Sequence, residues 1–392
     1  MKKSKGSGSK KKIQPALLLT LLFASLAGIV LLGLYAGFAN RSAGNRSPLY
    51  EEIYSSDTDL NESIRNIDYT IYESLYKNGV REKDVFFLNV QPRHRNGHVW
   101  EFVEILVNCP DNRFALNLQK IIKHALSVSG AGITLRREKD PEGRIICHVY
   151  AKDFHTHKII LSTDGLKPSI QDARPRIAII IDDLGYDSDT DFSFFQLDLP
   201  LSFSVLPYGP FTQSIVRKAR KEGCELILHQ PMEPKNYPSV KPGPGGLFLS
   251  MEAYKIRQVL DQNLRQVEGA RGMNNHMGSS FTEDRGKMLI VLNELKKRNL
   301  FFVDSRTTKN TVALDVARGI GLPAARRRVF LDNDLAPRAM KIQMERLLSM
   351  SRHLGAAIGI GHPYKETYQL LEQYGPEIKR EFQIVLVSEL VS

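Results

Sequence analysis

The stretch IAIIIDDLG, residues 177–185, decides the fold of the C-terminal half of this 392-residue chain. Five apolar residues run into two adjacent aspartates, which a leucine and a glycine follow. A short, continuous apolar run is typical of a strand buried on both faces, as in a parallel sheet covered by helices. The two aspartates therefore fall where such a strand ends, which is where parallel sheets carry their ligand sites.

Similar apolar runs recur along the rest of the chain. They lie at 201–206, 224–228, 270–275, 300–303, 329–331 and 356–360. Amphipathic stretches typical of helices separate them, so the pattern is one of seven strand-helix units. Such a series predicts a parallel sheet with covering helices, and the number of units favours closure into a barrel over residues 176–392. A further strand is expected at 381–390.

Residues 58–165 have a different pattern. The first helical segment carries apolar residues three or four positions apart and ends at Gly79, a residue typical of a helix C-cap. A second helical segment at 113–130 lies among five strand-like runs. The pattern predicts a small α+β domain, which the short linker LKPSIQDARPR, residues 166–176, joins to the barrel.

The net charge of +11 is concentrated at the N-terminus. Six lysines lie within the first 12 residues and contribute more than half of that charge. Nucleic-acid binding needs clustered cations on a folded surface, and no later segment concentrates them strongly. We therefore expect no nucleic-acid partner.

The segment after these lysines predicts a membrane anchor. No charged residue occurs from position 13 to position 40. At ~1.5 Å per helical residue, residues 13–38 are long enough to cross the ~30 Å apolar layer of a bilayer. The positive-inside rule then gives a cytoplasmic tail at 1–12, a single transmembrane helix at 13–38 and a tether at 39–57, with the folded domains on the extracytoplasmic, periplasmic side of the inner (cytoplasmic) membrane. A cleaved signal peptide is the alternative interpretation.

The three cysteines show no Cys-x-x-Cys spacing of the kind that binds metals or performs redox chemistry. Cys109 and Cys147 lie in one predicted domain, where they either form a disulfide in an oxidising compartment or remain thiols. Cys224, inside an apolar run, is expected to be a buried thiol.

Polar residues follow nearly every predicted barrel strand. The loops at the C-terminal ends of barrel strands build the active site, so these residues are the candidates for chemistry. They are Asp182, Asp183, His229, Asn275, His276, Asp304, Asp332 and His362. A single aspartate after a strand often caps the next helix, and Asp304 and Asp332 fit that role as well as a site role. Two adjacent aspartates and three histidines at one barrel mouth predict a functional site, because buried charge requires compensation.

These residue types favour metal-assisted hydrolysis. Carboxylates and imidazoles without a thiolate suit Zn²⁺ or a related divalent cation, and three protein ligands leave a position for water. A neighbouring carboxylate then accepts a proton and a histidine protonates the leaving group. The sequence has no Gly-x-Ser-x-Gly motif and no phosphate-binding Gly-x-x-x-x-Gly-Lys-Ser/Thr loop, which disfavours a serine hydrolase and a P-loop enzyme.

Five motifs in order, IIIDDLG, LHQPMEP, GMNNHMGS, FFVDSRT and IGIGHPY, resemble the divergent polysaccharide deacetylase family. The resemblance extends from residue 176 to the C-terminus and places the barrel in the polysaccharide deacetylase-like superfamily. It implies an α/β fold with a deformed (β/α)7 barrel. It also implies a metal-dependent hydrolase that removes N- or O-acetyl groups from an envelope polysaccharide or other glycan.

The resemblance also implies roles for single residues. Asp182 matches the general base, Asp183 a metal ligand and His362 the general acid. His229 matches the first histidine of the His-x-x-x-His-Pro motif, and Glu233 stands in the place of the second.

The family's arginine-containing motif is absent after the fourth strand, where NNHMGS occurs instead. We hypothesise that His276 replaces the missing ligand, so that Asp183, His229 and His276 bind the metal. Glu233 then either binds the metal or orients one of its ligands. Asn275, Asp304 and Asp332 are expected around this centre, in contact with ligands or substrate.

A second function remains open. In this alternative, the barrel serves as a catalytically degenerate envelope scaffold that binds a metal or a glycan without turning it over, while residues 58–165 contact an envelope protein. Asp182 and His362 favour an enzyme, since metal binding alone requires neither.

Overall fold

The computed structural model describes residues 58–165 and 174–392. The predicted cytoplasmic tail (1–12), membrane anchor (13–38) and tether (39–57) lie outside the described residues. Among the helices that the structure does describe, none is both long and apolar enough to cross a membrane. The described residues fall in one compact unit, residues 50–392, which contains two sheets.

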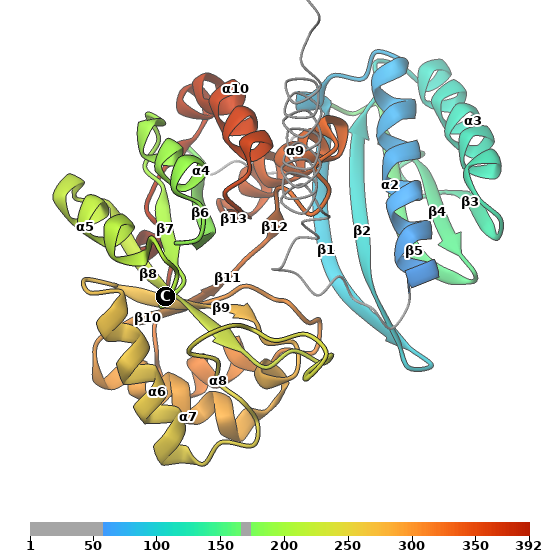
Figure 1. The fold of residues 1–392 in the computed structure, drawn as a ribbon. Helices are drawn as coiled ribbons and strands as arrows, with labels where there is room; N and C mark the ends of the chain where they lie inside the picture. Colours follow the sequence, from blue (N-terminus) through green and yellow to red (C-terminus); the bar gives the residue numbers. More distant parts are fainter. Residues whose placement is uncertain (1–57, 166–173) are drawn as a thin grey trace, which may run out of the picture. The chain divides into compact units, whose positions relative to one another are not determined.

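The first sheet has the strand order β1-β2-β5-β4-β3, and both helices of this region, α2 and α3, lie on the same side of it (Figure 1). Its neighbouring strands are antiparallel except for the parallel pair β2 and β5. Asp111 begins α3 by accepting a hydrogen bond from the Phe114 backbone N at 2.7 Å. The elements of this region are α2 (Thr58–Lys77), η2 (Glu82–Asp84), β1 (Val85–Arg95), β2 (His98–Asn108), α3 (Asn112–Ser129), β3 (Ile133–Lys139), β4 (Ile145–Ala151) and β5 (Phe154–Ser162).

The second sheet is parallel and curls back on itself. Its strands follow the chain from β6 through β7, β8, β9 and β10 to β11, and β13 pairs with β6, so the last full strand returns to the first. The predicted architecture of a deformed β/α barrel is confirmed. The strands are β6 (Arg176–Leu184), β7 (Ser202–Val205), β8 (Glu225–Met232), β9 (Gly272–Met277), β10 (Phe301–Asp304), β11 (Ala324–Arg326), β12 (Val329–Phe330), β13 (Ala356–Gly361) and β14 (Gln383–Ile384).

The barrel is deformed between β10 and β13, where β12 occupies the predicted strand at 329–331 and a further short strand, β11, precedes it. β11 pairs with β10, whereas β12 pairs with β13. Between them the Arg327 backbone N donates to the Asp304 carbonyl at 3.0 Å, and the Arg328 backbone N donates to the Ile358 carbonyl at 2.8 Å. Because β10 and β13 diverge here, the segment between β11 and β12 donates one backbone hydrogen bond to each of them.

The predicted terminal strand at 381–390 is wrong for most of its length. Only β14 pairs with β6, and a 3₁₀ turn, η5 (Val387–Glu389), follows it. The reason is that the chain turns into the barrel: Val387 is fully buried among inward-facing strand residues, and its backbone N donates to the Ser202 hydroxyl at 3.0 Å.

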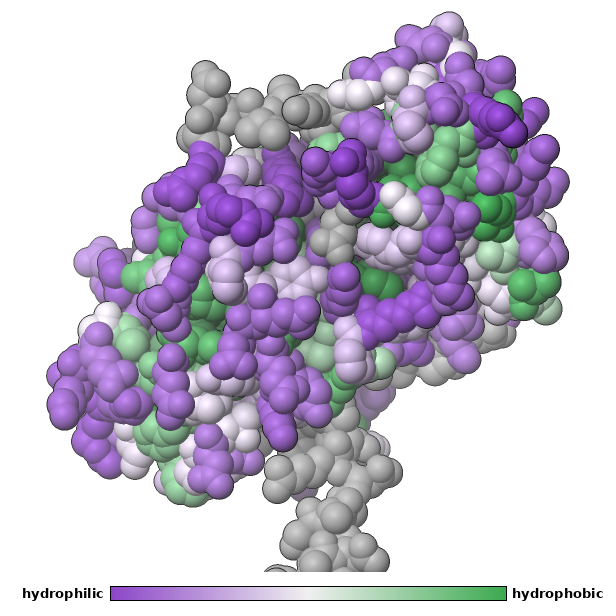
Figure 2. Space-filling model, turned by 90° about the horizontal axis from the view of Figure 1, so that it is seen from above, coloured by the Kyte–Doolittle hydropathy of each residue, from purple (hydrophilic) through white to green (hydrophobic). Residues whose placement is uncertain are grey.

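Helices cover the outside of the curled sheet (Figure 1). They are α4 (Ser188–Ser193), α5 (Thr212–Glu222), α6 (Ala253–Gln266), α7 (Arg285–Lys297), α8 (Ala313–Gly319), α9 (Pro337–Leu354) and α10 (Lys365–Glu381), with short 3₁₀ turns η3 (Phe194–Gln196) and η4 (Phe281–Glu283). On the face seen in Figure 2, hydrophilic residues predominate and hydrophobic ones form small patches between them. Burial of the apolar faces of these helices against the sheet is what stabilises the barrel.

A separate apolar cluster fills the inside of the curled sheet. Among its members are Ile180 of β6, Ile227 of β8 and Ile360 of β13, and none of its buried members lies in an α-helix. Because side chains alternate along a strand, the residue two positions further on each strand faces the same interior. Those positions hold Asp182, His229 and His362, so the sheet itself directs them into one site.

All three cysteines are free thiols, so the disulfide option for Cys109 and Cys147 does not hold in this structure. Both are buried, and burial raises the pKa of each thiol to about 12. They pack as small apolar side chains in the core of the first sheet.

Candidate metal centre

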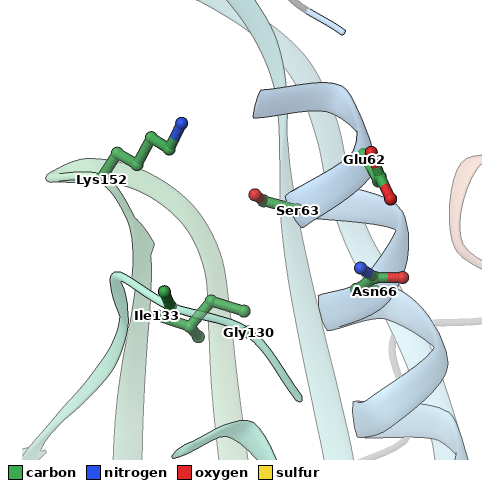
Figure 3. A pocket seen from close by; sticks show the side chains of 7 residues that line it. Glu62, Ser63, Asn66, Gly130, Ile133 and Lys152 are labelled. Carbon is green, nitrogen blue, oxygen red and sulfur yellow. The ribbon is translucent and has the colours of Figure 1, made fainter. Parts of the chain in front are cut away.

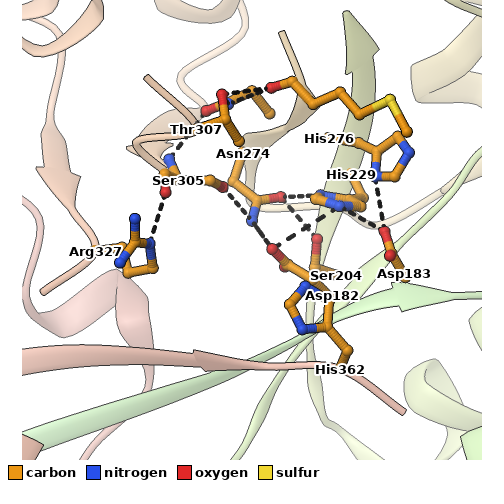
Figure 4. A network of polar contacts seen from close by, with 12 residues as sticks. Asp182, Asp183, Ser204, His229, Asn274, His276, Ser305, Thr307, Arg327 and His362 are labelled. Carbon is orange, nitrogen blue, oxygen red and sulfur yellow. Dashed lines mark hydrogen bonds and ion pairs between the residues drawn. The ribbon is translucent and has the colours of Figure 1, made fainter. Parts of the chain in front are cut away.

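Asp183, His229 and His276 meet at the C-terminal ends of β6, β8 and β9 (Figure 4). Asp183 Oδ1 lies 2.9 Å from His229 Nε2 and 2.8 Å from His276 Nδ1. One potential ligand atom from each residue lies within 4.8 Å of the other two. These are the three residues that the sequence predicts as metal ligands.

The end of β6 turns two consecutive aspartates toward the same place. On a regular strand, Asp182 and Asp183 would point to opposite faces. Here the pairing with β7 shifts register between Ile181 and Leu184, and Asp183 adopts a positive φ of 59°. Aspartate tolerates this left-handed conformation better than most residues, so the carboxylate of Asp183 can reach the site beside that of Asp182.

The amide of Asn274 fixes the tautomer of His229. Its Nδ2 donates to both carboxylate oxygens of Asp182, at 2.8 and 3.0 Å, so its Oδ1 must accept. That oxygen lies 2.8 Å from His229 Nδ1 and also accepts from the Ser204 hydroxyl at 2.7 Å. His229 Nδ1 therefore carries the proton, and in the neutral ring Nε2 presents a lone pair toward Asp183.

The donor set fits a divalent cation. Asp183 Oδ1 and His276 Nδ1 are buried and approach each other closely, yet neither has a partner with the angular geometry of a hydrogen bond. Buried polar atoms are nearly always paired, and converging lone pairs are what a bound cation satisfies. Two imidazole nitrogens with one carboxylate oxygen are ligands that Zn²⁺ accepts while keeping a position open.

The pKa shifts at these residues favour an ionised carboxylate. Burial alone would raise the pKa of Asp183, but the charge of His276, the charge of His229 and the close approach of both rings lower it well below its usual value. Burial alone would likewise lower the pKa of His229, while the charge of Asp182 and the contact with Asp183 raise it. The site is thus held together by strong attraction between imidazole and carboxylate groups.

Asp182 lies next to the three ligand candidates but is not one of the three residues whose ligand atoms converge. It is 1% exposed, and its Oδ2 is 3.8 Å from His229 Nε2. The Asn274 amide holds both of its oxygens. Asp182 is therefore a fixed, buried carboxylate beside the centre, the arrangement that a general base needs.

His362, at the end of β13, is held by Asp332. Asp332 Oδ1 lies 2.8 Å from His362 Nδ1, while Oδ2 accepts from the His362 backbone N at 2.5 Å and from the Thr367 hydroxyl at 2.6 Å. Burial would lower the pKa of His362, but the charge of Asp332, the hydrogen bond to it and the charges of Asp183 and Asp182 raise it to about 9. His362 is thus protonated at neutral pH, with its Nδ1 bound to Asp332.

Three predicted site residues support loops instead of joining the centre. The Glu233 carboxylate accepts from the Leu249 backbone N at 2.8 Å. Asp304 accepts from the Arg306 backbone N at 2.9 Å and the Thr311 hydroxyl at 3.0 Å. Asn275 Oδ1 accepts from the Ser305 backbone N at 2.9 Å. Each of these side chains fixes the course of a loop around the barrel mouth.

We expect Glu233→Gln to keep its metal. The change removes the charge from a hydrogen bond to backbone, which costs about 1–2 kcal/mol of unfolding free energy. Metal content per chain and urea unfolding check this. The control is Glu252→Gln, an exposed glutamate before α6 that makes no side-chain cap. Loss of metal only in Glu233→Gln would make Glu233 a ligand, as one reading of the sequence has it.

Sequence reasoning missed Asn274 and Ser204. The signal for Asn274 was present, because it lies two positions before His276 on β9 and therefore faces the same side of the sheet. The sequence pattern instead pointed to Asn275, the neighbour of His276, but the alternation of side chains along β9 turns Asn275 to the other face. Ser204, inside an apolar strand, carries no local signal.

A pocket beside α2 can be compared with the barrel mouth for its supply of metal ligands. A cavity of about 380 Å³ lies between α2 and the turns around Gly130 and Lys152 (Figure 3). Its lining presents one carboxylate, from Glu62, and one amine, from Lys152, with no histidine or cysteine. It lacks the converging ligand atoms of the barrel mouth.

The family model for divergent polysaccharide deacetylases matches residues 179–391, and the chain belongs to this family. The match covers the barrel and all the residues of the candidate centre.

Relatives with similar sequences have no described function. An uncharacterised protein of Haemophilus influenzae is 32% identical over 232 residues, which cover 59% of this chain and 82% of that protein. The uncharacterised protein YibQ of Escherichia coli is 31% identical over 217 residues, covering 55% of this chain and 67% of that protein. The crystal structure of the uncharacterised protein ATU2773 from Agrobacterium tumefaciens matches with a TM-score of 0.54 and 27% identity, over 59% of this chain and 97% of that one.

Proposed function

We propose that this chain is a metal-dependent hydrolase that removes acetyl groups from an envelope polysaccharide or other glycan. The observation that supports it most is the presence of two proton-transfer groups, Asp182 and the Asp332-held His362, beside the three converging ligand atoms of Asp183, His229 and His276. Binding of a metal alone would need neither group.

Asp183, His229 and His276 would hold the cation. A divalent cation there supplies Lewis acidity, which polarises an acyl carbonyl and makes water more acidic. Zn²⁺ is the ion that this donor set suits best.

Asp182 accepts the proton of the attacking water. Its two oxygens are already held by Asn274, so the carboxylate is oriented before substrate binds and loses little entropy in the reaction. His362 donates a proton from Nε2 to the departing amine or alcohol, while Asp332 keeps Nδ1 occupied and stabilises the charged ring.

The chain would act at the envelope. We propose that residues 13–38 anchor it in the inner membrane with a single pass, and that residues 58–165 and 176–392 form two domains on the extracytoplasmic side. The first domain would then be available to an envelope protein partner.

Acetate release tests the proposal. Residues 41–392 are loaded with Zn²⁺ and incubated with N-acetylated and O-acetylated glycans, and free acetate is measured. We expect release that stops on chelation and returns with Zn²⁺. One metal per chain with no release from any of these glycans would favour the scaffold function.

The pH profile should show the titration of His362. Because the acid must be protonated, kcat/KM should fall as the pH rises through the folded pKa of about 9. In Asp332→Asn the main source of the raised pKa is gone, so the fall should begin at lower pH. Arg338, exposed and outside the site, provides the control variant Arg338→Gln. An alkaline limb that does not move in Asp332→Asn would contradict the role of His362.

A further inference from the structure

Three exposed tyrosines stand on consecutive loops at the barrel mouth. Tyr186, Tyr208 and Tyr237 follow β6, β7 and β8 and are 49%, 40% and 42% exposed. Loops that leave the C-terminal ends of barrel strands surround the same mouth, so these rings share it with the metal centre.

Two glycines hold the first two loops together. A Cβ on Gly209 would lie 2.3 Å from the Gly185 carbonyl oxygen, a distance that no side chain can occupy. The same carbonyl accepts from the Phe211 backbone N at 2.9 Å. Tyr186 and Tyr208 are the chain neighbours of these glycines, so the backbone contact brings their loops side by side.

The third loop packs onto Tyr208. A Cβ on Gly245 would lie 2.9 Å from Tyr208 Cε2, and the Gly245 carbonyl accepts from the Asn263 amide at 2.8 Å. The same loop carries Tyr237, whose ring centroid is 4.9 Å from that of Phe248. Packing therefore connects the three tyrosines in series from the β6 loop to the β8 loop.

The series begins at the metal centre. Tyr186 lies three residues after the ligand candidate Asp183 and follows the end of β6 closely, so it is the tyrosine of the series nearest to the centre along the chain. A molecule lying along the tyrosines would thus have one end at the reacting groups.

The chemistry of the rings suits sugar. A tyrosine ring offers a flat apolar face and a hydroxyl that stays in water, so it binds ligands that are apolar on one side and polar around the rim. Pyranose rings have this character, with C–H groups on a face and hydroxyls at the edge. A nucleic-acid strand would need an accompanying cationic groove, whereas Lys235 of the β8 loop is paired with Glu283 at 2.7 Å.

We propose that Tyr186, Tyr208 and Tyr237 form a stacking platform that binds successive sugar rings of a polysaccharide chain leading into the metal centre. This inference rests on the proposed function for the identity of the acetylated glycan. It adds where such a polymer would be held, at several sugar rings beyond the one that reacts.

The dependence of binding on the length of the glycan tests the platform. The full-length protein carrying Asp182→Asn, which prevents turnover, is titrated calorimetrically with the dimer and the hexamer of β-1,4-linked N-acetylglucosamine. We expect the hexamer to bind more tightly than the dimer, and Tyr208→Ala and Tyr186→Ala each to weaken hexamer binding about tenfold, as expected for loss of an aromatic contact. Tyr208→Phe should retain it.

The control is Leu354→Ala. Leu354 is also exposed, at 46%, but it ends α9 and so lies toward the opposite end of the barrel from the strand C-termini. Thermal unfolding of each variant checks that the fold is intact.

The outcomes separate the platform from the hydrolase. Tyrosine-dependent hexamer binding without acetate release in the wild type would support the platform and overturn the proposed hydrolysis. Acetate release from the hexamer with an unchanged KM in Tyr208→Ala and Tyr186→Ala would overturn the platform and leave the hydrolase standing. Hexamer binding that is absent, or equal in every variant, would also overturn the platform.

Discussion

Asp182→Asn should lower the rate of acetate release about 10²- to 10⁴-fold, the range expected when a general base is removed. The substituted amide has nearly the same shape but cannot take a proton from water. Metal content should stay near that of the wild type, because the ligand candidates Asp183, His229 and His276 are unchanged. Steady-state rates and elemental analysis of the same preparation provide both numbers.

The control for this prediction is Asp187→Asn. Asp187 caps α4 by accepting from the backbone N of Asp189 and Thr190, and it takes no part in the centre. Its removal should leave kcat within about twofold while lowering the unfolding free energy by about 1 kcal/mol. An Asp182→Asn protein that retains the wild-type rate would exclude Asp182 as the base. One that loses its metal would make Asp182 a ligand.

His276→Ala should abolish stable metal binding. Only Asp183 and His229 would then remain, and two ligands leave a divalent cation mostly hydrated. We expect metal affinity to fall at least a hundredfold, and acetate release to fall with it. Mutating a residue that only hydrogen-bonds a metal ligand already lowers metal affinity about 10- to 100-fold, and His276 is proposed to be a ligand itself. Competition with a chromophoric chelator measures the affinity.

His124→Ala controls for the loss of a histidine. His124 is exposed on α3, far along the chain from the barrel, and its side chain contributes nothing to the centre. It should bind metal like the wild type. Full occupancy in His276→Ala would refute the assignment of the third ligand.

The strand-end rule selected residues that the structure brings together. Apolar runs such as 177–181 identified the strands, and the polar residues after them included Asp183, His229 and His276, which the structure brings together. The local pattern suffices because a parallel sheet places every strand end at the same edge. The family resemblance, confirmed by the match over 179–391, added the expectation of a deformed (β/α)7 barrel and of acetyl-group hydrolysis on a glycan.

Side-chain direction limited the prediction of the surrounding residues. Asn274 and Asn275 are adjacent in sequence, yet only Asn274 faces the centre, and the choice follows from strand parity relative to His276. The motif position of Glu233 predicts a role at the metal. Its carboxylate is drawn away by the backbone of Leu249, a contact that depends on the path of a long loop and has no local signal.

The strand order of the first sheet could not be predicted from the sequence. Periodicity located its helices and strands, but the parallel pairing of β2 with β5 depends on contacts between distant segments. Apolar alternation reports burial and does not report which strand is the neighbour.

The most direct measurement is a crystal structure of the Zn²⁺-loaded barrel with data collected on both sides of the zinc absorption edge. The account predicts one strong anomalous peak bonded to Asp183, His229 and His276, at about 2.0–2.2 Å from each ligand atom. A peak that includes Glu233 in place of His276, or a structure in which these three side chains bind no metal, would contradict it.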